Sequence, residues 1–213
     1  MSYLKKIEEL NRNPTSFPGG ILEGANVRTP CGPRRVELVR AGDLIVTRDN
    51  GLQPVRAIWR REVSSAEMAS NIDLAPIRLK PRAIGPMMPQ RDVCLALDHR
   101  ILVPGYRLLG EEKTTGCLVE ARDLAGTSDA VYVDCTTEIV RYFTLVFDAH
   151  QVFCTNGLPV ESFFPSPETV SDLDDSLRDD LARMFPTLTR KRYAYPSLKY
   201  KVAVGAEFLS SHF

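Results

Sequence analysis

The chain has 213 residues, with 27 Lys and Arg against 27 Asp and Glu, and 44% of its residues are hydrophobic. This composition is ordinary for one soluble globular domain that is long enough to bury a substantial core. The zero net charge gives no global attraction to nucleic acid or to anionic membranes, so we expect neither as a partner, and no stretch approaches the roughly 20 apolar residues of a membrane span.

The first residues, MSYLKKIEELNRNP, lack the apolar core and the small-residue cleavage site of a signal peptide. This predicts a cytoplasmic protein, with export that needs no signal peptide as the alternative. The five cysteines agree with a reducing compartment, because their number is odd and no Cys-x-x-Cys pair occurs. We therefore predict neither a disulfide framework nor a zinc knuckle, and we expect no cofactor.

Residues 1–16 are expected to form an N-terminal helix and a linker. The helix is predicted over residues 2–12, because Ser2 can cap it and apolar residues at helical spacing form one stripe. Asn13-Pro14 should end it, since the residue before a proline avoids the helical conformation.

Residues 17–165 have the pattern of one mainly β domain, in which short apolar or alternating runs are separated by turn signals. The sequence Asp-Asn-Gly at residues 49–51 predicts a tight turn, and the alternation over Val55–Arg60 predicts a half-buried strand. A long β-rich run, Ile139–Phe147, is followed by a second one over residues 150–155. No stretch here shows a convincing helical period, so we expect helices largely at the two ends of the chain.

Residues 166–213 are expected to form a C-terminal helix and a basic tail that pack on the domain. The helix is predicted over residues 171–185, with Ser171 and Asp174 resembling a capping box and with an apolar stripe on one face. The tail, RKRYAYPSLKYK at residues 190–201, has the basic and aromatic pattern of nucleic-acid binders. Packing of its tyrosines on the domain is the favoured interpretation, because the net charge is zero and the preceding helix is acidic.

Three segments, in this order, resemble the Hint (hedgehog/intein) family. The first is GILEGANVRTPCG at residues 20–32, continued by RVE at 35–37 and AGDLIVTRD at 41–49. The second is LALDHRIL at residues 95–102, and the third is DAHQVFCTNGLPVESF at residues 148–163. The third segment is similar to the ending of a bacterial Hint subgroup. The resemblance implies a mainly β, disk-shaped fold with short terminal helices.

Members of this family process themselves, as in protein splicing. The side chain of the first residue attacks the preceding carbonyl, which requires a thiol or a hydroxyl. The matching position here is Gly20, which has no attacking atom, and Ala96 stands where active members have a Thr or Ser that clamps the scissile amide. His99 keeps the position of the histidine that protonates the leaving nitrogen. The resemblance therefore implies a degenerate Hint domain that is not an enzyme.

Two alternatives stay open. One is an active autoproteolytic domain that uses an internal cysteine, and the other is a non-enzymatic interaction module whose terminal helices dock a partner. The sequence identifies no partner and no oligomeric state.

His150 matches the downstream histidine of the family. If residues 148–154 form a strand, Asp148, His150 and Cys154 share one face and could form a Cys–His pair with an orienting acid. The alternatives are a small buried thiol near a hydrogen-bonded histidine, or a metal ion bound by the two histidines and a cysteine. His99 is either a remnant of the catalytic site or a structural histidine, and we expect it close to the backbone of Gly20.

Overall fold

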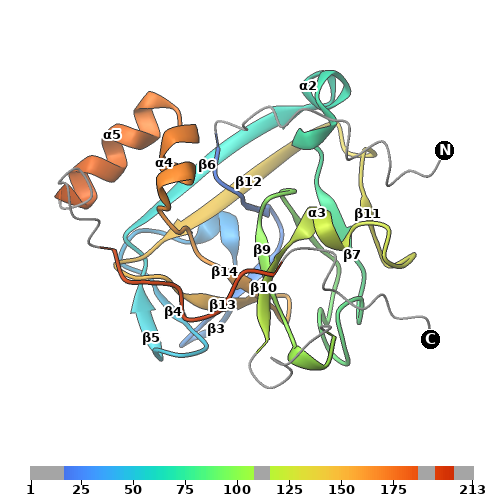
Figure 1. The fold of residues 1–213 in the computed structure, drawn as a ribbon, viewed down its shortest axis with the longest axis horizontal. Helices are drawn as coiled ribbons and strands as arrows, with labels where there is room; N and C mark the ends of the chain where they lie inside the picture. Colours follow the sequence, from blue (N-terminus) through green and yellow to red (C-terminus); the bar gives the residue numbers. More distant parts are fainter. Residues whose placement is uncertain (1–16, 108–115, 187–194, 204–213) are drawn as a thin grey trace.

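The computed structural model describes residues 17–107, 116–186 and 195–203 (Figure 1). In these ranges the chain is mainly β, which confirms the predicted fold class. Two six-stranded sheets and a separate two-stranded hairpin contain the described strands, and all paired strands run antiparallel. The helix predicted over residues 2–12 lies outside the described residues.

The strand order places β1, the strand that begins at the Hint-like first segment, in the middle of the first sheet. From edge to edge this sheet contains β11 (Val131–Val133), β7 (Ile77–Leu79), β8 (Val93–Leu95), β1 (Ile21–Leu22), β12 (Ile139–Val146) and β6 (Ala57–Ser64). The second sheet contains β10 (Cys117–Glu120), β9 (Arg100–Val103), β14 (Leu158–Glu161), β13 (Val152–Thr155), β2 (Asn26–Thr29) and β3 (Gly32–Arg35). The hairpin consists of β4 (Leu44–Val46) and β5 (Leu52–Pro54).

Both Asn-Gly pairs of the chain lie in turns, and the one within residues 49–51 is where the sequence predicts it. Residues 47–51 connect β4 and β5, and Gly51 adopts a φ of +64°. Asn156 and Gly157 connect β13 and β14 with φ values of +46° and +84°. The two-residue turn of Asn156 and Gly157 needs positive φ at both positions, which Asn and Gly tolerate best.

The long strand β12 is buried on both faces and separates two apolar cores. Phe143 and Leu145 point into the main core, which the two large sheets share. Tyr142 and Val146 point the other way, into a second core with Trp59 of β6. Because side chains alternate along a strand, Thr144 belongs to the Tyr142 face.

The expectation that helices lie largely at the chain ends was partly wrong. Inside the β region the structure has α2 (Ser65–Ser70), α3 (Ala121–Leu124) and the short 3₁₀ helices η1 (Val36–Leu38), η2 (Ile72–Leu74) and η3 (Gly105–Arg107). These elements are too short to show a helical period. A start signal was nevertheless present for α2, because Ser64 and Glu67 form a capping box.

The single helix predicted over residues 171–185 is two helices, α4 (Pro167–Asp172) and α5 (Asp175–Met184). Ser171 is not a cap; instead, Ser166 caps α4 and Asp174 caps α5, where its side chain accepts from the Leu177 N–H. Leu173 between the helices has an extended backbone and is buried in the second core. The apolar stripe therefore packs on the domain although the helix is interrupted.

The described part of the basic tail also contacts the domain. Tyr195 is buried and its hydroxyl donates to the Phe147 carbonyl at 3.0 Å. Tyr200 is buried and its hydroxyl bonds to the Asp49 carboxylate at 2.9 Å. Residues 190–194 lie outside the described ranges. None of the described helices has the length and hydrophobicity that a membrane crossing requires.

Candidate functional site

The Gly19–Gly20 peptide is held where β1 begins, between β8 and β12. Ile21 is opposite Leu95 of β8 on one side and opposite Phe143 of β12 on the other. This pairing brings the residues that follow β8 to one edge of the peptide and Thr144 of β12 to the other edge. The Gly20 carbonyl accepts a hydrogen bond from the Ala96 N–H at 2.9 Å, which continues the β1–β8 pairing by one step.

His99 contacts the peptide directly, as expected from the resemblance. The Gly20 N–H donates to Nδ1 of His99 at 3.0 Å. A turn that follows β8 brings the ring into place, because the His99 N–H donates to the Ala96 carbonyl at 3.1 Å. The sequence separation of this contact is 79 residues, so the fold alone brings the two groups together.

His99 is neutral at physiological pH. It is buried, and the loss of hydration lowers its pKa to about 4. Since Nδ1 accepts from the Gly20 N–H, the single ring proton of the neutral form must be on Nε2. Nδ1 of His99, the nitrogen that faces the Gly20 amide, therefore carries no proton to donate.

Two further side chains bind the chain at this point. The Gly19 N–H donates to the Asp98 carboxylate at 3.1 Å, and burial raises the pKa of that carboxyl group. The Thr144 hydroxyl lies 3.0 Å from the Pro18 carbonyl oxygen and 3.3 Å from the Gly19 carbonyl oxygen. It can donate its one proton to either of them. The peptide is thus held on its N–H side and on its carbonyl side.

The position of Gly20 has no room for a side chain. Its φ is +149°, and a Cβ atom built there would lie 2.8 Å from Cβ of Tyr142. Tyr142 is itself fixed, because it is buried and its hydroxyl donates to the Leu74 carbonyl at 2.8 Å. Glycine is the residue that accepts both the backbone conformation and the close contact.

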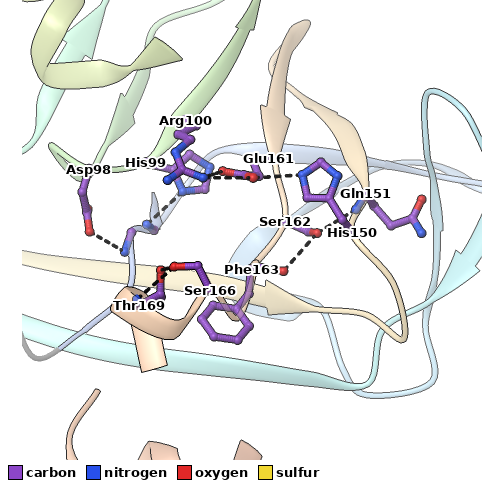
Figure 2. Close-up of polar contacts among 12 residues, drawn as sticks. Asp98, His99, Arg100, His150, Gln151, Glu161, Ser162, Phe163, Ser166 and Thr169 are labelled. Carbon is purple, nitrogen blue, oxygen red and sulfur yellow. Dashed lines mark hydrogen bonds and ion pairs between the residues drawn. The ribbon is translucent and has the colours of Figure 1, made fainter. Parts of the chain in front are cut away.

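A second buried polar group surrounds Glu161, next to His99 (Figure 2). Nε2 of His150 lies 2.9 Å from the Glu161 carboxylate, and Nη1 of Arg100 lies 3.3 Å from it. Glu161 ends β14 and is buried, while Arg100 begins β9 beside it. Figure 2 shows His99 and Arg100 on one side of the Glu161 side chain and His150 on the other.

The expected cluster of Asp148, His150 and Cys154 does not form. The strand β13 begins only at Val152, so Asp148 is outside it, is exposed and pairs with Arg56 at 3.0 Å. Among the described residues, no hydrogen bond or ion pair connects His150 to Asp148 or Cys154. Burial raises the pKa of the Cys154 thiol, which disfavours the thiolate that a nucleophile needs.

A cavity of about 520 Å³ opens beside the Gly19–Gly20 peptide. His99, Thr144 and Glu161 contribute to its lining, together with residues of η2, β10 and α4. Within the described ranges, no group of three or more His, Cys, Asp and Glu side chains is arranged to hold a metal ion.

Sequence reasoning missed Thr144, Tyr142 and Glu161 as parts of the site. Thr144 was recognisable as the one polar residue in the apolar run over residues 142–147. Glu161 was recognisable as an acid that ends the otherwise apolar strand β14. The contact of Tyr142 with Gly20 has no signal in the local sequence, since it depends on strand pairing across the sheet.

Comparison with known proteins gives one family. No protein of curated function matches the chain. Among solved structures, the chain is similar to a DnaB intein from Synechocystis sp. PCC 6803, with 14% identity, a TM-score of 0.45, and coverage of 68% of this chain and 99% of that one. It is also similar to a bacterial intein-like domain from Clostridium thermocellum, with 15% identity, a TM-score of 0.41, and coverage of 69% and 100%. A model of the Hint domain matches residues 20–167. Because this match begins at the glycine that His99 holds and spans more than half of the sequence, the chain belongs to the Hint domain family.

Proposed function

We propose that this chain is a Hint domain that has lost the self-cleavage reaction and keeps the scaffold that holds the Gly19–Gly20 peptide. The observation that carries the proposal is the closed position at residue 20. A thiol or hydroxyl side chain begins with a Cβ atom, and that atom would lie 2.8 Å from Cβ of Tyr142. The loss is therefore more than one missing nucleophile, because the surrounding structure is adapted to glycine.

The protonation state of His99 supports the same proposal. A general acid works best when its pKa is near the working pH. The pKa of His99 is lowered to about 4, and Nδ1 already accepts a hydrogen bond from the amide that it would have to protonate. At neutral pH the ring acts as an acceptor that positions the peptide.

The groups nearest to the peptide offer no replacement nucleophile. The Thr144 hydroxyl is a hydrogen-bond donor to the carbonyl oxygens of Pro18 and Gly19. Its contacts are with these oxygens and not with the carbonyl carbon that a nucleophile would attack. The internal-cysteine alternative has less support. Cys154 lies opposite Pro159 in the β13–β14 hairpin, and burial raises the pKa of its thiol.

The test is the intact mass of the purified chain before and after incubation with a strong thiol or with hydroxylamine. These reagents capture the thioester or ester that an acyl shift would form. We expect a single species at 23.8 kDa throughout. A fragment that begins at Gly20 would be lighter by 19 of the 213 residues, about 2 kDa, and would contradict the proposal.

A further inference from the structure

The two large sheets end in four edge strands, β11 and β6 in the first sheet and β10 and β3 in the second. An edge strand presents unpaired N–H and C=O groups to which another strand can bind. The tail covers β10, since the Leu118 N–H donates to the Lys201 carbonyl at 2.8 Å. β3 contains Pro33, which has no N–H to donate, and β11 has only three residues. β6 is eight residues long and contains no proline, so it is the described edge best suited to bind another strand.

Alternate residues of β6 direct their backbone groups away from the sheet. The Ser65 N–H donates to the Glu138 carbonyl at 2.6 Å, and this bond fixes the alternation along the β6–β12 pair. The odd-numbered residues of β6 therefore face β12, and Ile58, Arg60 and Glu62 face outward. Within the described ranges, no hydrogen bond is made to the N–H or C=O groups of these three residues. Figure 1 shows β12 along one side of β6 and no strand along the other.

A row of alternating charges crosses the first sheet and stops at this edge. Arg141 of β12 lies between Glu23, at 3.1 Å, and Glu62 of β6, at 2.7 Å. The Glu62 side chain is still 53% exposed, so a strand added at this edge would favour a cation opposite it. Arg60 lies two residues away on the same face of β6. It is exposed and forms no ion pair within the described ranges, so it would favour an anion opposite it.

A second copy of β6 supplies both charges in one register. In an antiparallel pair, opposite residues that both face the shared edge exchange their N–H···O bonds. A twofold axis beside Arg61 sets Arg60 opposite the partner's Glu62 and, by symmetry, Glu62 opposite the partner's Arg60. The backbone groups of both residues face outward, so this register also satisfies their hydrogen bonds. Twofold pairs of this kind are the commonest form of soluble oligomer.

We propose that two copies of this chain associate through antiparallel pairing of their β6 strands, with Arg60 of each copy opposite the partner's Glu62. The first sheet of one copy then continues into the first sheet of the other. Because the contact is short and charged, we expect a weak pair that forms with rising concentration. The proposal does not rest on the proposed function, since β12 separates β6 from β1, where the Gly19–Gly20 peptide is held.

The first test follows the unmodified chain by sedimentation equilibrium from about 10 µM to about 1 mM, where weak pairs become populated. We expect the mass to rise from 23.8 kDa toward twice that value. Over the same range, hydrogen exchange at the amides of Ile58, Arg60 and Glu62 should slow. The amides of Trp59 and Arg61 are the internal control, because they already face β12. A monomer at every concentration would overturn the proposal, and so would association that leaves exchange at Arg60 and Glu62 unchanged.

The second test is a pair of complementary variants. Arg60→Glu and Glu62→Lys each place like charges opposite one another at both symmetric contacts, so each variant alone should associate at least about tenfold more weakly. An equimolar mixture of the two should recover the association, because every contact then joins opposite charges. Arg141 keeps its contact with Glu23 in the Glu62→Lys variant.

Arg91→Glu is the control for overall charge, since Arg91 is exposed and lies outside β6. It should associate like the parent. A mixture that associates as weakly as the separate variants, or a control that loses as much as Arg60→Glu, would overturn the proposal.

A third variant tests the register with the opposite sign. The twofold axis sets Arg61 opposite the partner's Arg61, and like charges directly opposite one another oppose association. Arg61→Gln should therefore strengthen the pair about threefold in the same sedimentation measurement. Weakening by Arg61→Gln would contradict an axis at this position and reject the proposed pairing.

Discussion

Two buried histidines lie on either side of Glu161, and they are held in opposite ways. His150 is fixed by a carboxylate, with Nε2 2.9 Å from Glu161, and its ring packs edge-on against Phe164 at 5.8 Å. His99 is fixed by a backbone amide, the Gly20 N–H, and its other nitrogen has no partner among the described residues. His150 belongs to the network around Glu161 and Arg100, and His99 holds the Gly19–Gly20 peptide.

The two histidines therefore contact different parts of the fold, one the second sheet and the other the Gly19–Gly20 peptide at the start of β1. The His150–Glu161–Arg100 group connects the β13–β14 hairpin to β9, so it ties the second sheet together. The His99–Gly20 contact connects the start of β1 to the turn after β8, as do the bonds from the Ala96 N–H to the Gly20 carbonyl and from the Gly19 N–H to the Asp98 carboxylate. The His99 contact acts on the backbone of the Gly19–Gly20 peptide itself.

The largest effect is expected from Glu161→Ala. Removing one partner of a buried ionic group leaves charged or polar groups without compensation, which costs about 3–5 kcal/mol. Glu161 is 6% exposed and serves both His150 and Arg100. Urea unfolding should show this loss. The control is Glu62→Ala, whose carboxylate pairs with Arg141 and is 53% exposed; its cost should stay below about 1 kcal/mol. Similar losses for both variants would mean that the Glu161 network is not structural.

Gly20→Ala tests the closed position at residue 20, next to His99. The new Cβ meets Tyr142 in a backbone conformation that side chains rarely adopt. We expect a loss of about 2–4 kcal/mol in the free energy of unfolding, from backbone strain and overpacking together. Gly126→Ala is the matched control, because Gly126 has a φ of +77° and open space around it, and should show the backbone cost of about 1 kcal/mol alone. If the two variants lose the same amount, position 20 is open.

The same contact limits any attempt to restore cleavage. Gly20→Cys with Ala96→Thr supplies the missing thiol and hydroxyl, but it leaves Cβ of Tyr142 in the way. We expect no thiol-dependent cleavage in this double variant, as measured by intact mass. Adding Tyr142→Gly removes the clashing atom, so slow cleavage in the triple variant alone would identify Tyr142 as the block. Cleavage in the double variant would instead show that the site adapts easily.

His99 also predicts a pH dependence. Its pKa is lowered from 6.5 to about 4 in the folded chain, so the unfolded chain binds a proton below pH 6.5 that the folded chain does not. The stability linked to neutral His99 is complete above pH 6.5 and is lost progressively down to pH 4, by about 3 kcal/mol at most. Asp98, whose pKa is raised by burial, acts in the opposite direction. Unfolding curves of the parent and of His99→Gln should therefore differ in slope over this window, and parallel curves would contradict a buried neutral histidine.

The smallest effect is expected from Thr144→Val, which keeps the shape of the side chain and removes its hydroxyl. The variant loses one hydrogen bond to the carbonyls of Pro18 and Gly19, which is worth about 1 kcal/mol. Thermal unfolding measures it. A loss as large as that of Glu161→Ala would mean that Thr144 has other structural contacts.

The sequence predicted those parts of the molecule that depend on local pattern. Alternating runs and the Asp-Asn-Gly turn at residues 49–51 indicated β hairpins, and the resemblance placed His99 beside Gly20. The break between α4 and α5 was missed because the apolar stripe continues through Leu173, although Asp174 is a good cap. Tyr142, Thr144 and Glu161 reach the site only through strand pairing between distant segments. Their roles follow from topology, which local pattern does not contain.

The proposed loss of cleavage rests on the closed position at residue 20, and the scaffold that holds the peptide depends most directly on the hydrogen bond between the Gly20 N–H and Nδ1 of His99. The measurement that tests it is the ¹⁵N chemical shift of both His99 ring nitrogens, followed from pH 7 to pH 3 in the uncleaved chain. We predict an unprotonated Nδ1, a protonated Nε2 and a titration near pH 4. A proton on Nδ1, or a titration near the ordinary value of 6.5, would show that His99 does not hold the peptide and would contradict the proposal.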